Sequence, residues 1–412
     1  MKARKLEFHS KNLLLTERGE SWLACFRDED KQTARDLVAG LTLISATEFE
    51  RGLVKALEDV AHSYHGRVAL FAVREVPKDI PLFVDSSSQV DATPSGADIG
   101  SEGRIAALIR NLTRSDKKKF LNHPTIEEMR TAKCDAVIFV DDFVGSGQRV
   151  SLYLESFYAN PTIKSWYSYH KFSIDVVAYS AANSGIRTVK NNRLAPSMTV
   201  VRSCPTIETK LTWSEETRER IVGLCFKYSN ELKMRMPLGY KNTGALIIFE
   251  HSCPNNCPQI LWGNSKAPNW SPLFREKTVA SDARDVFPPE MTAHTPSHML
   301  INAGAARLAA KLGDSFPRPL PVAWVAILAL FQKGVSHVEA VESATGLDNK
   351  ESLQAIEKCI SFGLISQKLR LTDLGRRELH AYQKISIKNK KTLPNDKEQY
   401  YYPRALRRFD DF

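Results

Sequence analysis

One stretch of twelve residues, from Val137 to Gln148, constrains the fold more than any other part of the chain. It reads Val-Ile-Phe-Val-Asp-Asp-Phe-Val-Gly-Ser-Gly-Gln, so four apolar residues precede two adjacent carboxylates and a Gly-Ser-Gly turn. A short apolar run bounded by a turn is typical of a buried strand in a parallel sheet. Ligands of open α/β sheets bind beyond the carboxyl ends of the strands. The stretch therefore predicts a strand, a turn and a helix, with polar groups at the ligand-binding edge.

Other apolar runs of strand length are separated by stretches with helical spacing. The predicted strands lie at 68–73, 136–141, 174–179, 198–201 and 245–249. We expect helices over much of 1–66, at 105–112 and after Gln148. This alternation predicts an α/β fold with a parallel sheet and helices on both faces. A loop at 77–103, rich in Ser, Asp, Gly and Pro, is long enough to be either functional or disordered.

The rhythm changes after three prolines at 317, 319 and 321, which predict a domain boundary. Helices are expected at 323–332, at 336–344 with a capping box from Ser336 to Glu339, and at 348–362 with Leu353, Ile356 and Ile360 facing inward. A two-stranded wing at 363–372 and a closing helix at 373–382 complete the pattern of a winged helix-turn-helix. The predicted domains are 1–316, with a core at 67–202 and flanking elements at 1–66 and 203–316, then 317–383, and a basic tail at 384–412.

Composition agrees with a folded chain of two or three domains. Apolar residues make up 43% and charged residues 25% of the 412 residues, which excludes disorder throughout. The longest apolar run, Val322 to Phe331, has ten residues, whereas a membrane-spanning helix needs about 20. Seven thinly spread cysteines do not form a disulfide framework. We therefore expect a cytoplasmic protein without a membrane partner, and its net charge of +10 favours polyanionic partners or ligands.

The turn after the predicted strand has the chemistry of an anion site. Gly145 and Gly147 let the backbone approach an anion, and the Ser146 hydroxyl and the helix N-terminus can hold a phosphate. Asp141 and Asp142 would then lie beside the attached sugar, where they accept hydrogen bonds from hydroxyls and help to hold Mg²⁺ carried by a pyrophosphate. The alternative is a chance occurrence of this pattern in an α/β protein.

These residues resemble the phosphoribosyl pyrophosphate (PRPP) motif of type I phosphoribosyltransferases. The resemblance implies that Asp141 and Asp142 bind the ribose hydroxyls and that Gly145, Ser146 and Gly147 bind the 5′-phosphate. Gln148 stands where the family has Thr, and its amide can still donate a hydrogen bond. Arg74, after the first core strand, is placed to bind pyrophosphate. The implied reaction is transfer at the anomeric carbon with pyrophosphate leaving; no general base is assigned, and the sequence leaves open whether transfer activity persists.

A second segment, from His251 to Trp262 and on to Arg275, resembles part of phosphoribosyltransferase-like proteins in bacterial conflict and defence systems. It makes Asn255, Asn256 and Trp262 candidate substrate contacts, although Trp262 could equally pack in the core. Cys253, Cys257 and His251 lack a second pair with zinc spacing, so no zinc site is expected.

The domain order is similar to that of the effector in certain retron antiphage systems. The resemblance implies a toxin-like protein whose winged helix holds a reverse transcriptase and its msDNA and noncoding RNA. One alternative is a PRPP-responsive transcription regulator, although such regulators place the winged helix first. The other is a nucleobase salvage transferase, although such enzymes are shorter. Homo-oligomerisation stays open.

The predicted winged helix is almost neutral. Residues 318–383 hold eight basic and seven acidic residues, whereas the last 29 residues hold eight basic and four acidic residues. Because strong duplex binding needs several phosphate contacts, we predict that the winged helix chiefly docks a ribonucleoprotein partner. The predicted nucleic-acid or partner contacts are Lys350, Lys358, Lys368, Arg370, Lys390, Lys391, Arg407 and Arg408.

Overall fold

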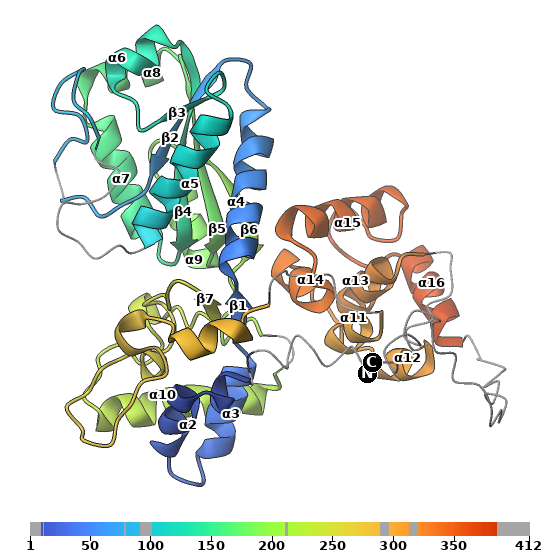
Figure 1. The fold of residues 1–412 in the computed structure, drawn as a ribbon. Helices are drawn as coiled ribbons and strands as arrows, with labels where there is room; N and C mark the ends of the chain where they lie inside the picture. The colour runs from blue at the N-terminus through green and yellow to red at the C-terminus, as the bar shows by residue number, and fades with distance from the viewer. Residues whose placement is uncertain are drawn as a thin grey trace, which may run out of the picture.

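The computed structural model describes residues 10, 12–77, 80–90, 101–210, 213–288, 296–312 and 320–384. It has three parts: a parallel sheet flanked by helices, a smaller lobe beneath the sheet, and a helical C-terminal domain at its side (Figure 1). No helix within the described ranges is long and apolar enough to cross a membrane.

The main sheet has five parallel strands in the order β3-β2-β4-β5-β6. Their bounds are β2 Arg67–Ala72, β3 Phe120–Asn122, β4 Cys134–Val144, β5 Ser173–Ala181 and β6 Ser197–Ser203. The chain moves from β2 to one side for β3 and then to the other side for β4. The topological switch point therefore lies between β2 and β4, which is where sheets of this kind bind ligands.

Helices cover both faces of the sheet, as the near-continuous apolar strands require. Successive residues of a strand point to opposite faces, so Leu70 belongs to one core and Phe71 to the other. The first core includes α4 and α5, and the second includes α7 and α8 (Figure 1). The helices of this part are α4 Ala46–Ala61, α5 Ser101–Ser115, α6 Ile126–Thr131, α7 Gln148–Tyr158, α8 Pro161–Ser168 and α9 Asn183–Lys190.

The lobe beneath the carboxyl ends of the strands, which we call the hood, combines the N-terminal segment with residues after β6 (Figure 1). Its elements are α2 Glu17–Ala24, α3 Lys31–Ala39, β1 Thr42–Ile44, α10 Glu215–Glu231 and β7 Ile247–Phe249. The run at 245–249 was expected to join the main sheet, and this expectation is wrong: β7 pairs with β1 in a separate two-stranded sheet. The fifth strand of the main sheet is β3, whose three residues are too few to show a period.

The C-terminal domain has its own core, formed by α11 Pro296–Asn302, α12 Ala306–Leu312, α13 Val322–Gln332, α14 Val338–Thr345, α15 Asn349–Ser361 and α16 Asp373–Lys384. Its helices occur in the predicted order. The helices α11 and α12 also pack in this core, whereas the sequence predicts that 203–316 belongs to the first domain. Of these two short helices, α11 packs against α13 and α14, and α12 packs against α11.

Three local predictions for this domain need correction. Ser336 does not cap α14, which begins after His337 without a side-chain hydrogen bond; the capping box instead joins Asp348 and Glu351 at the start of α15. Leu353 is 43% exposed, because α15 buries Ala355, Ile356 and Cys359 on the face beside it. The wing is reduced to one antiparallel bridge between Ile365 and Leu371.

Candidate functional site

The predicted site residues come together where the sheet meets the hood. Arg74 follows β2, Asp141 and Asp142 lie near the end of β4, and the hood brings His251 and Asn256 to the same place. Strands β2 and β4 and the hood therefore contribute residues to one region at the topological switch point. This arrangement agrees with the expected position of a ligand site in an open α/β sheet.

The two aspartates are more enclosed than the sequence suggested. Asp141 is 1% exposed and Asp142 is 5% exposed, although we expected both to face a ligand. Arg149, in the first turn of α7, donates from Nη2 to Oδ1 of Asp141 at 2.5 Å and to Oδ1 of Asp142 at 3.2 Å. Its guanidinium thus bridges the pair. Arg149 directly follows the matched motif, but nothing in its spacing indicated that the side chain folds back onto β4.

The electrostatics of the pair are asymmetric. Burial raises the pKa of Asp141 well above its ordinary value, against the opposing effect of Arg149. Burial also disfavours the charged form of Asp142, but contacts with His251 and Arg149 outweigh it and lower the pKa of Asp142. Asp141 in turn raises the pKa of Arg149, which stays charged. Asp142 is therefore firmly ionised, and Asp141 is the carboxylate that protonates first as the pH falls.

One oxygen of the pair is left without a partner. Asp141 Oδ2 is buried and makes no hydrogen bond within the described part of the chain. Oδ2 of Asp142 lies 3.6 Å from Nε2 of His251, which is an ion-pair distance and too long for a hydrogen bond. A buried oxygen without a donor is costly, so Asp141 Oδ2 is a position where a bound hydroxyl would be stabilised.

His251, which is not expected to bind zinc, lies beside Asp142. The structure places its ring between Phe49, at a centroid distance of 5.1 Å, and Phe249, which stacks on it at 5.1 Å. This aromatic surround fixes the ring beside Asp142. No sequence pattern indicated this contact, because more than a hundred residues separate His251 from Asp142.

The Gly-Ser-Gly turn is closely packed against Asn256 of the hood and Gly185 of α9. A Cβ on Gly145 would come within 2.3 Å of the Asn256 side chain, and Gly147 has a φ of 77°. Gly185, in α9, approaches the carbonyls of the turn so closely that a Cβ there would lie 2.5 Å from the Gly145 oxygen. Gly147 is the N-cap of α7 and provides no side-chain cap. The turn is therefore fixed in place. The first N–H of α7, from Gln148, donates to the Ser146 hydroxyl at 3.4 Å, and Gly147 supplies no side-chain cap.

Two of the candidate contacts in the hood, Asn256 and Trp262, form hydrogen bonds to other residues of the hood. Asn256 Nδ2 donates to the Tyr240 carbonyl at 3.2 Å and to Thr243 Oγ1 at 2.9 Å. The Tyr240 hydroxyl donates to Oε1 of Gln148 at 2.9 Å, so the hood also contacts the turn. Asn255 is exposed, and the half-buried Trp262 packs against the first core and donates from Nε1 to the Cys257 carbonyl.

Arg74 lies at the end of β2 with a half-buried side chain. Its Nη1 reaches the Glu75 carbonyl only at 3.5 Å, and its buried Nε has no hydrogen-bond partner among the described residues. Glu102, at the start of α5, accepts from the Glu75 N–H at 3.4 Å. Burial raises the pKa of Glu102, although Arg149 and Arg74 oppose this shift. Glu102 is a further ionisable group at the site, and its position in the sequence carries no motif that indicates this role.

The Mg²⁺ expected beside Asp141 and Asp142 does not fit the pair as the structure arranges it. The guanidinium of Arg149 already holds the position between their Oδ1 atoms. Within the described residues, no group of three or more His, Cys, Asp or Glu side chains is placed to hold a metal ion.

The predicted partner contacts of the winged helix are divided. Lys358, Lys368 and Arg370 are exposed, as a docking role requires. Lys350 instead forms an ion pair with Asp59 of α4 at 2.7 Å, so it contacts this chain's own first domain. The other four predicted contacts, Lys390, Lys391, Arg407 and Arg408, lie outside the described residues.

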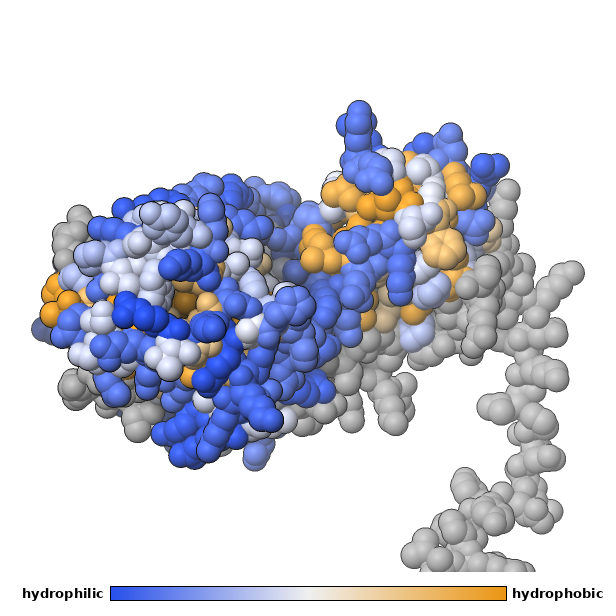
Figure 2. All heavy atoms as spheres, turned by 90° about the horizontal axis from the view of Figure 1, so that it is seen from above, coloured by the Kyte–Doolittle hydropathy of each residue, from blue (hydrophilic) through white to orange (hydrophobic). Residues whose placement is uncertain are grey.

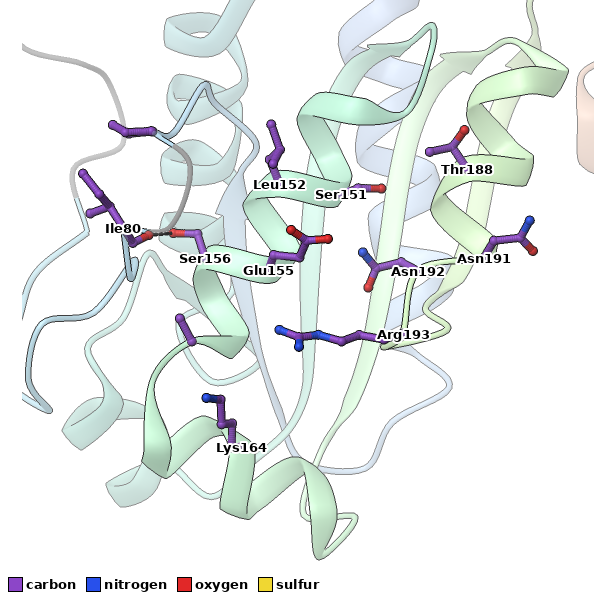
Figure 3. Close-up of a pocket in the computed structure, with 12 residues that line it drawn as sticks. Ile80, Ser151, Leu152, Glu155, Ser156, Lys164, Thr188, Asn191, Asn192 and Arg193 are labelled. Carbon is purple, nitrogen blue, oxygen red and sulfur yellow. Dashed lines mark hydrogen bonds between the residues drawn. The ribbon is translucent and has the colours of Figure 1, made fainter.

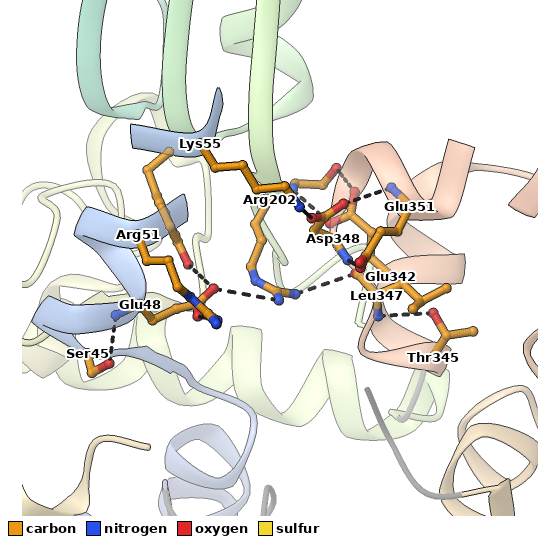
Figure 4. A network of polar contacts seen from close by, with 12 residues as sticks. Ser45, Glu48, Arg51, Lys55, Arg202, Glu342, Thr345, Leu347, Asp348 and Glu351 are labelled. Carbon is orange, nitrogen blue, oxygen red and sulfur yellow. Dashed lines mark hydrogen bonds and ion pairs between the residues drawn. The ribbon is translucent and has the colours of Figure 1, made fainter. Parts of the chain in front are cut away.

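A buried polar network joins the C-terminal domain to the end of β6 (Figure 4). Glu342 of α14 accepts hydrogen bonds from the Ser203 N–H at 2.8 Å, the Ser203 hydroxyl at 2.7 Å and Nδ2 of Asn349 at 2.6 Å. Arg202 lies between this cluster and Glu48 of α4, at 3.9 Å from the Glu48 carboxylate. Burial raises the pKa of Glu342 to about 7, against the hydrogen bonds that favour its charged form.

A separate cavity of about 720 Å³ lies outside the sheet, beside α7 (Figure 3). Arg193, from the segment after α9, and Lys164, from α8, supply positive charge to its wall. The Arg193 guanidinium also stacks over the Tyr158 ring at 4.4 Å. None of the residues singled out from the sequence lines this cavity.

Together, the sheet order, the acidic pair at the switch point and the helical C-terminal region define a phosphoribosyltransferase-like α/β domain joined to a winged helix-turn-helix region. A family model described as PRTase-CE matches residues 20–276, and a second one, described as wHTH-PRTase associated, matches residues 325–408. The chain therefore belongs to the PRTase-CE family. No curated protein and no solved structure matches it.

Proposed function

We propose that the first domain binds a phosphorylated ribose compound, PRPP or a nucleotide, and that the chain is the effector of a retron antiphage system. The observation that supports ligand binding most directly is the unpartnered, buried Asp141 Oδ2 close in sequence to the N-terminus of α7. A ribose hydroxyl would donate to this oxygen. The 5′-phosphate would accept from the N–H groups of the Gly145–Gln148 turn and of α7.

If the domain transfers ribose, the bond between the anomeric carbon and pyrophosphate breaks and a bond to the acceptor forms. Arg74 would face the departing pyrophosphate, because it follows the neighbouring strand at the switch point. Preorganised charge of this kind stabilises the charge that develops in the transition state. The acceptor and its proton acceptor are left unassigned.

The C-terminal domain would dock the reverse transcriptase and its msDNA and noncoding RNA. Large apolar side chains on its surface favour a contact with protein: Leu353, Phe362, Leu369 and Leu374 are at least 40% exposed. Figure 2 shows apolar surface gathered on this domain. The first turn of α15, which reads bases in helix-turn-helix proteins, is instead tied to Asp59 and Ser203 of this chain. Both observations favour docking over sequence-specific duplex binding.

Docking of a partner could reach the ligand site through a continuous set of contacts. Glu48, near Arg202 of the interdomain network, accepts from the Tyr179 hydroxyl at 3.3 Å. Tyr179 packs on Phe249, which stacks on His251 beside Asp142. A displacement of α14 would therefore act on groups that contact the acidic pair.

Binding of PRPP, ribose 5-phosphate and nucleoside monophosphates to the full chain tests the ligand assignment. A ligand that binds only the native state raises the melting temperature by mass action. Ser146→Asp should remove this rise, because it puts negative charge where the phosphate would bind. No rise with any phosphorylated ribose compound would contradict the assignment. Co-purification with a neighbouring reverse transcriptase tests the retron role, and tight sequence-specific duplex binding by the chain would instead favour the transcription regulator.

A further inference from the structure

The position where a divalent cation would meet the acidic pair is held by a side chain of the protein. One nitrogen of Arg149 contacts Oδ1 of both Asp141 and Asp142, at 2.5 Å and 3.2 Å. These are also the two oxygens that accept the backbone N–H groups of Asp142 and Phe143. Arg149 therefore orients both carboxylates and offsets part of their negative charge.

A second cation at this place would be repelled. Arg149 carries a permanent charge that the surrounding acids hold in place, and its side chain is only 32% exposed. Charges a few ångströms apart in a partly buried site interact much more strongly than they do in water. The remaining oxygens do not form a metal site of the protein alone. Asp142 Oδ2 faces His251, and the described residues contain no group of three or more His, Cys, Asp or Glu side chains that could hold a metal ion.

We propose that Arg149 takes the place of the divalent cation, so that the domain binds a phosphorylated ribose without Mg²⁺. This inference rests on the proposed function, since it concerns the same site. Arg149 is a positioning residue: it orients both carboxylates through their Oδ1 atoms and leaves Asp141 Oδ2 to hydrogen-bond to a ribose hydroxyl. The phosphate is held separately, by the N–H groups at the start of α7.

The first test measures binding of ribose 5-phosphate to the full wild-type chain by calorimetry, once with EDTA and once with excess MgCl₂. Ribose 5-phosphate is the suitable probe because it carries the sugar hydroxyls and the 5′-phosphate but no pyrophosphate to chelate the metal. We expect dissociation constants that agree within about threefold, well under the tenfold change that 1.4 kcal/mol produces.

The second test uses the metal alone as the probe. Arg149→Ala leaves two adjacent buried carboxylates without a counter-charge, so excess MgCl₂ should raise the melting temperature of this variant and leave that of the wild type unchanged. Arg149→Lys keeps the charge and should respond like the wild type. Arg110→Ala, an exposed arginine on α5, is the matched control and should not respond to the metal.

The outcomes separate the two proposals. Binding that requires Mg²⁺, or a melting temperature of the wild type that rises with Mg²⁺ alone, would overturn the role of Arg149 and leave the proposed ligand class intact. Absence of ribose 5-phosphate, PRPP and nucleotide binding under both conditions would overturn the proposed function itself, and the role of Arg149 with it. If Arg149→Ala does not fold, the binding and melting measurements on the wild type and on Arg149→Lys still test the role of Arg149.

Discussion

The carboxylate of Glu342 accepts hydrogen bonds from both the backbone N–H and the hydroxyl of Ser203, which places α14 of the C-terminal domain against the carboxyl end of β6. These contacts bury an acid in the interface between the winged-helix region and the phosphoribosyltransferase-like sheet. They also determine which surface of the winged helix is available to a partner, because α15 follows α14 directly and is turned toward α4.

We predict that Glu342→Ala loosens the interface. The substitution leaves the Ser203 N–H and the Asn349 amide without their acceptor, which costs about 1–3 kcal/mol for a buried group. Hydrogen exchange of β6 and α14 and the unfolding free energy of the full chain are the measurements. Glu357→Ala, at an exposed position of α15, should leave both unchanged. Equal effects of the two variants would show that Glu342 does not hold the interface.

The raised pKa of Glu342 predicts that the free energy of unfolding depends on pH. Its pKa is raised from 4.5 to about 7 in the folded chain, so the folded state binds a proton more tightly than the unfolded state. Stability from this group is therefore greatest below pH 4.5, falls as the pH rises to about 7, and changes no further above that. The difference in unfolding free energy between the wild type and Glu342→Gln should shift in favour of the wild type as the pH falls across this range. A difference that is constant with pH would contradict the buried, protonating acid.

Gly185→Ala should disturb the phosphate turn. The added Cβ would lie 2.5 Å from the Gly145 oxygen and 2.6 Å from the Val144 oxygen, and backbone atoms cannot move aside cheaply. We expect a destabilisation of about 1–3 kcal/mol and loss of the thermal shift with ribose 5-phosphate. The matched control is Gly223→Ala in α10, where nothing lies within 4 Å and alanine should stabilise the helix by up to about 1 kcal/mol. Retained ligand binding in Gly185→Ala would exclude the turn as the phosphate site.

The isosteric double substitution Asp141→Asn with Asp142→Asn should abolish biological activity while the chain stays folded. Two amides fill the same volume as the two carboxylates. The Arg149 side chain is partly exposed, so water can solvate its charge once both partners are neutral. Phage protection or toxicity is the functional readout, and a melting curve checks the fold. Wild-type activity of a folded double variant would contradict the site assignment.

Partner docking should depend on the apolar surface of the C-terminal domain and on the tail more than on Lys350. Phe362 is 62% exposed, so Phe362→Asp should reduce association with the partner complex without lowering the melting temperature. Truncation at Gln383 should weaken association more than Lys350→Ala does, because Lys350 is already paired with Asp59. Pull-down of the partner with each variant compares them. A larger loss with Lys350→Ala than with the other two would mean that the first turn of α15 separates from α4 and binds the partner.

Local sequence patterns were sufficient to predict the strand, turn and helix that carry the site. The alternation of apolar runs and helical stretches predicted the parallel sheet, and Val137 to Gln148 predicted a strand, a turn and a helix, because these depend on short-range periodicity and on glycine. The residues that surround these elements are known only from the folded chain. Arg149 folds back onto β4, His251 arrives from the hood, β7 pairs with β1, and Lys350 meets Asp59. Each of these contacts depends on packing between separate elements. The spacing and composition of a segment do not specify which distant residue will pair with its charge, or which distant strand will pair with its edge.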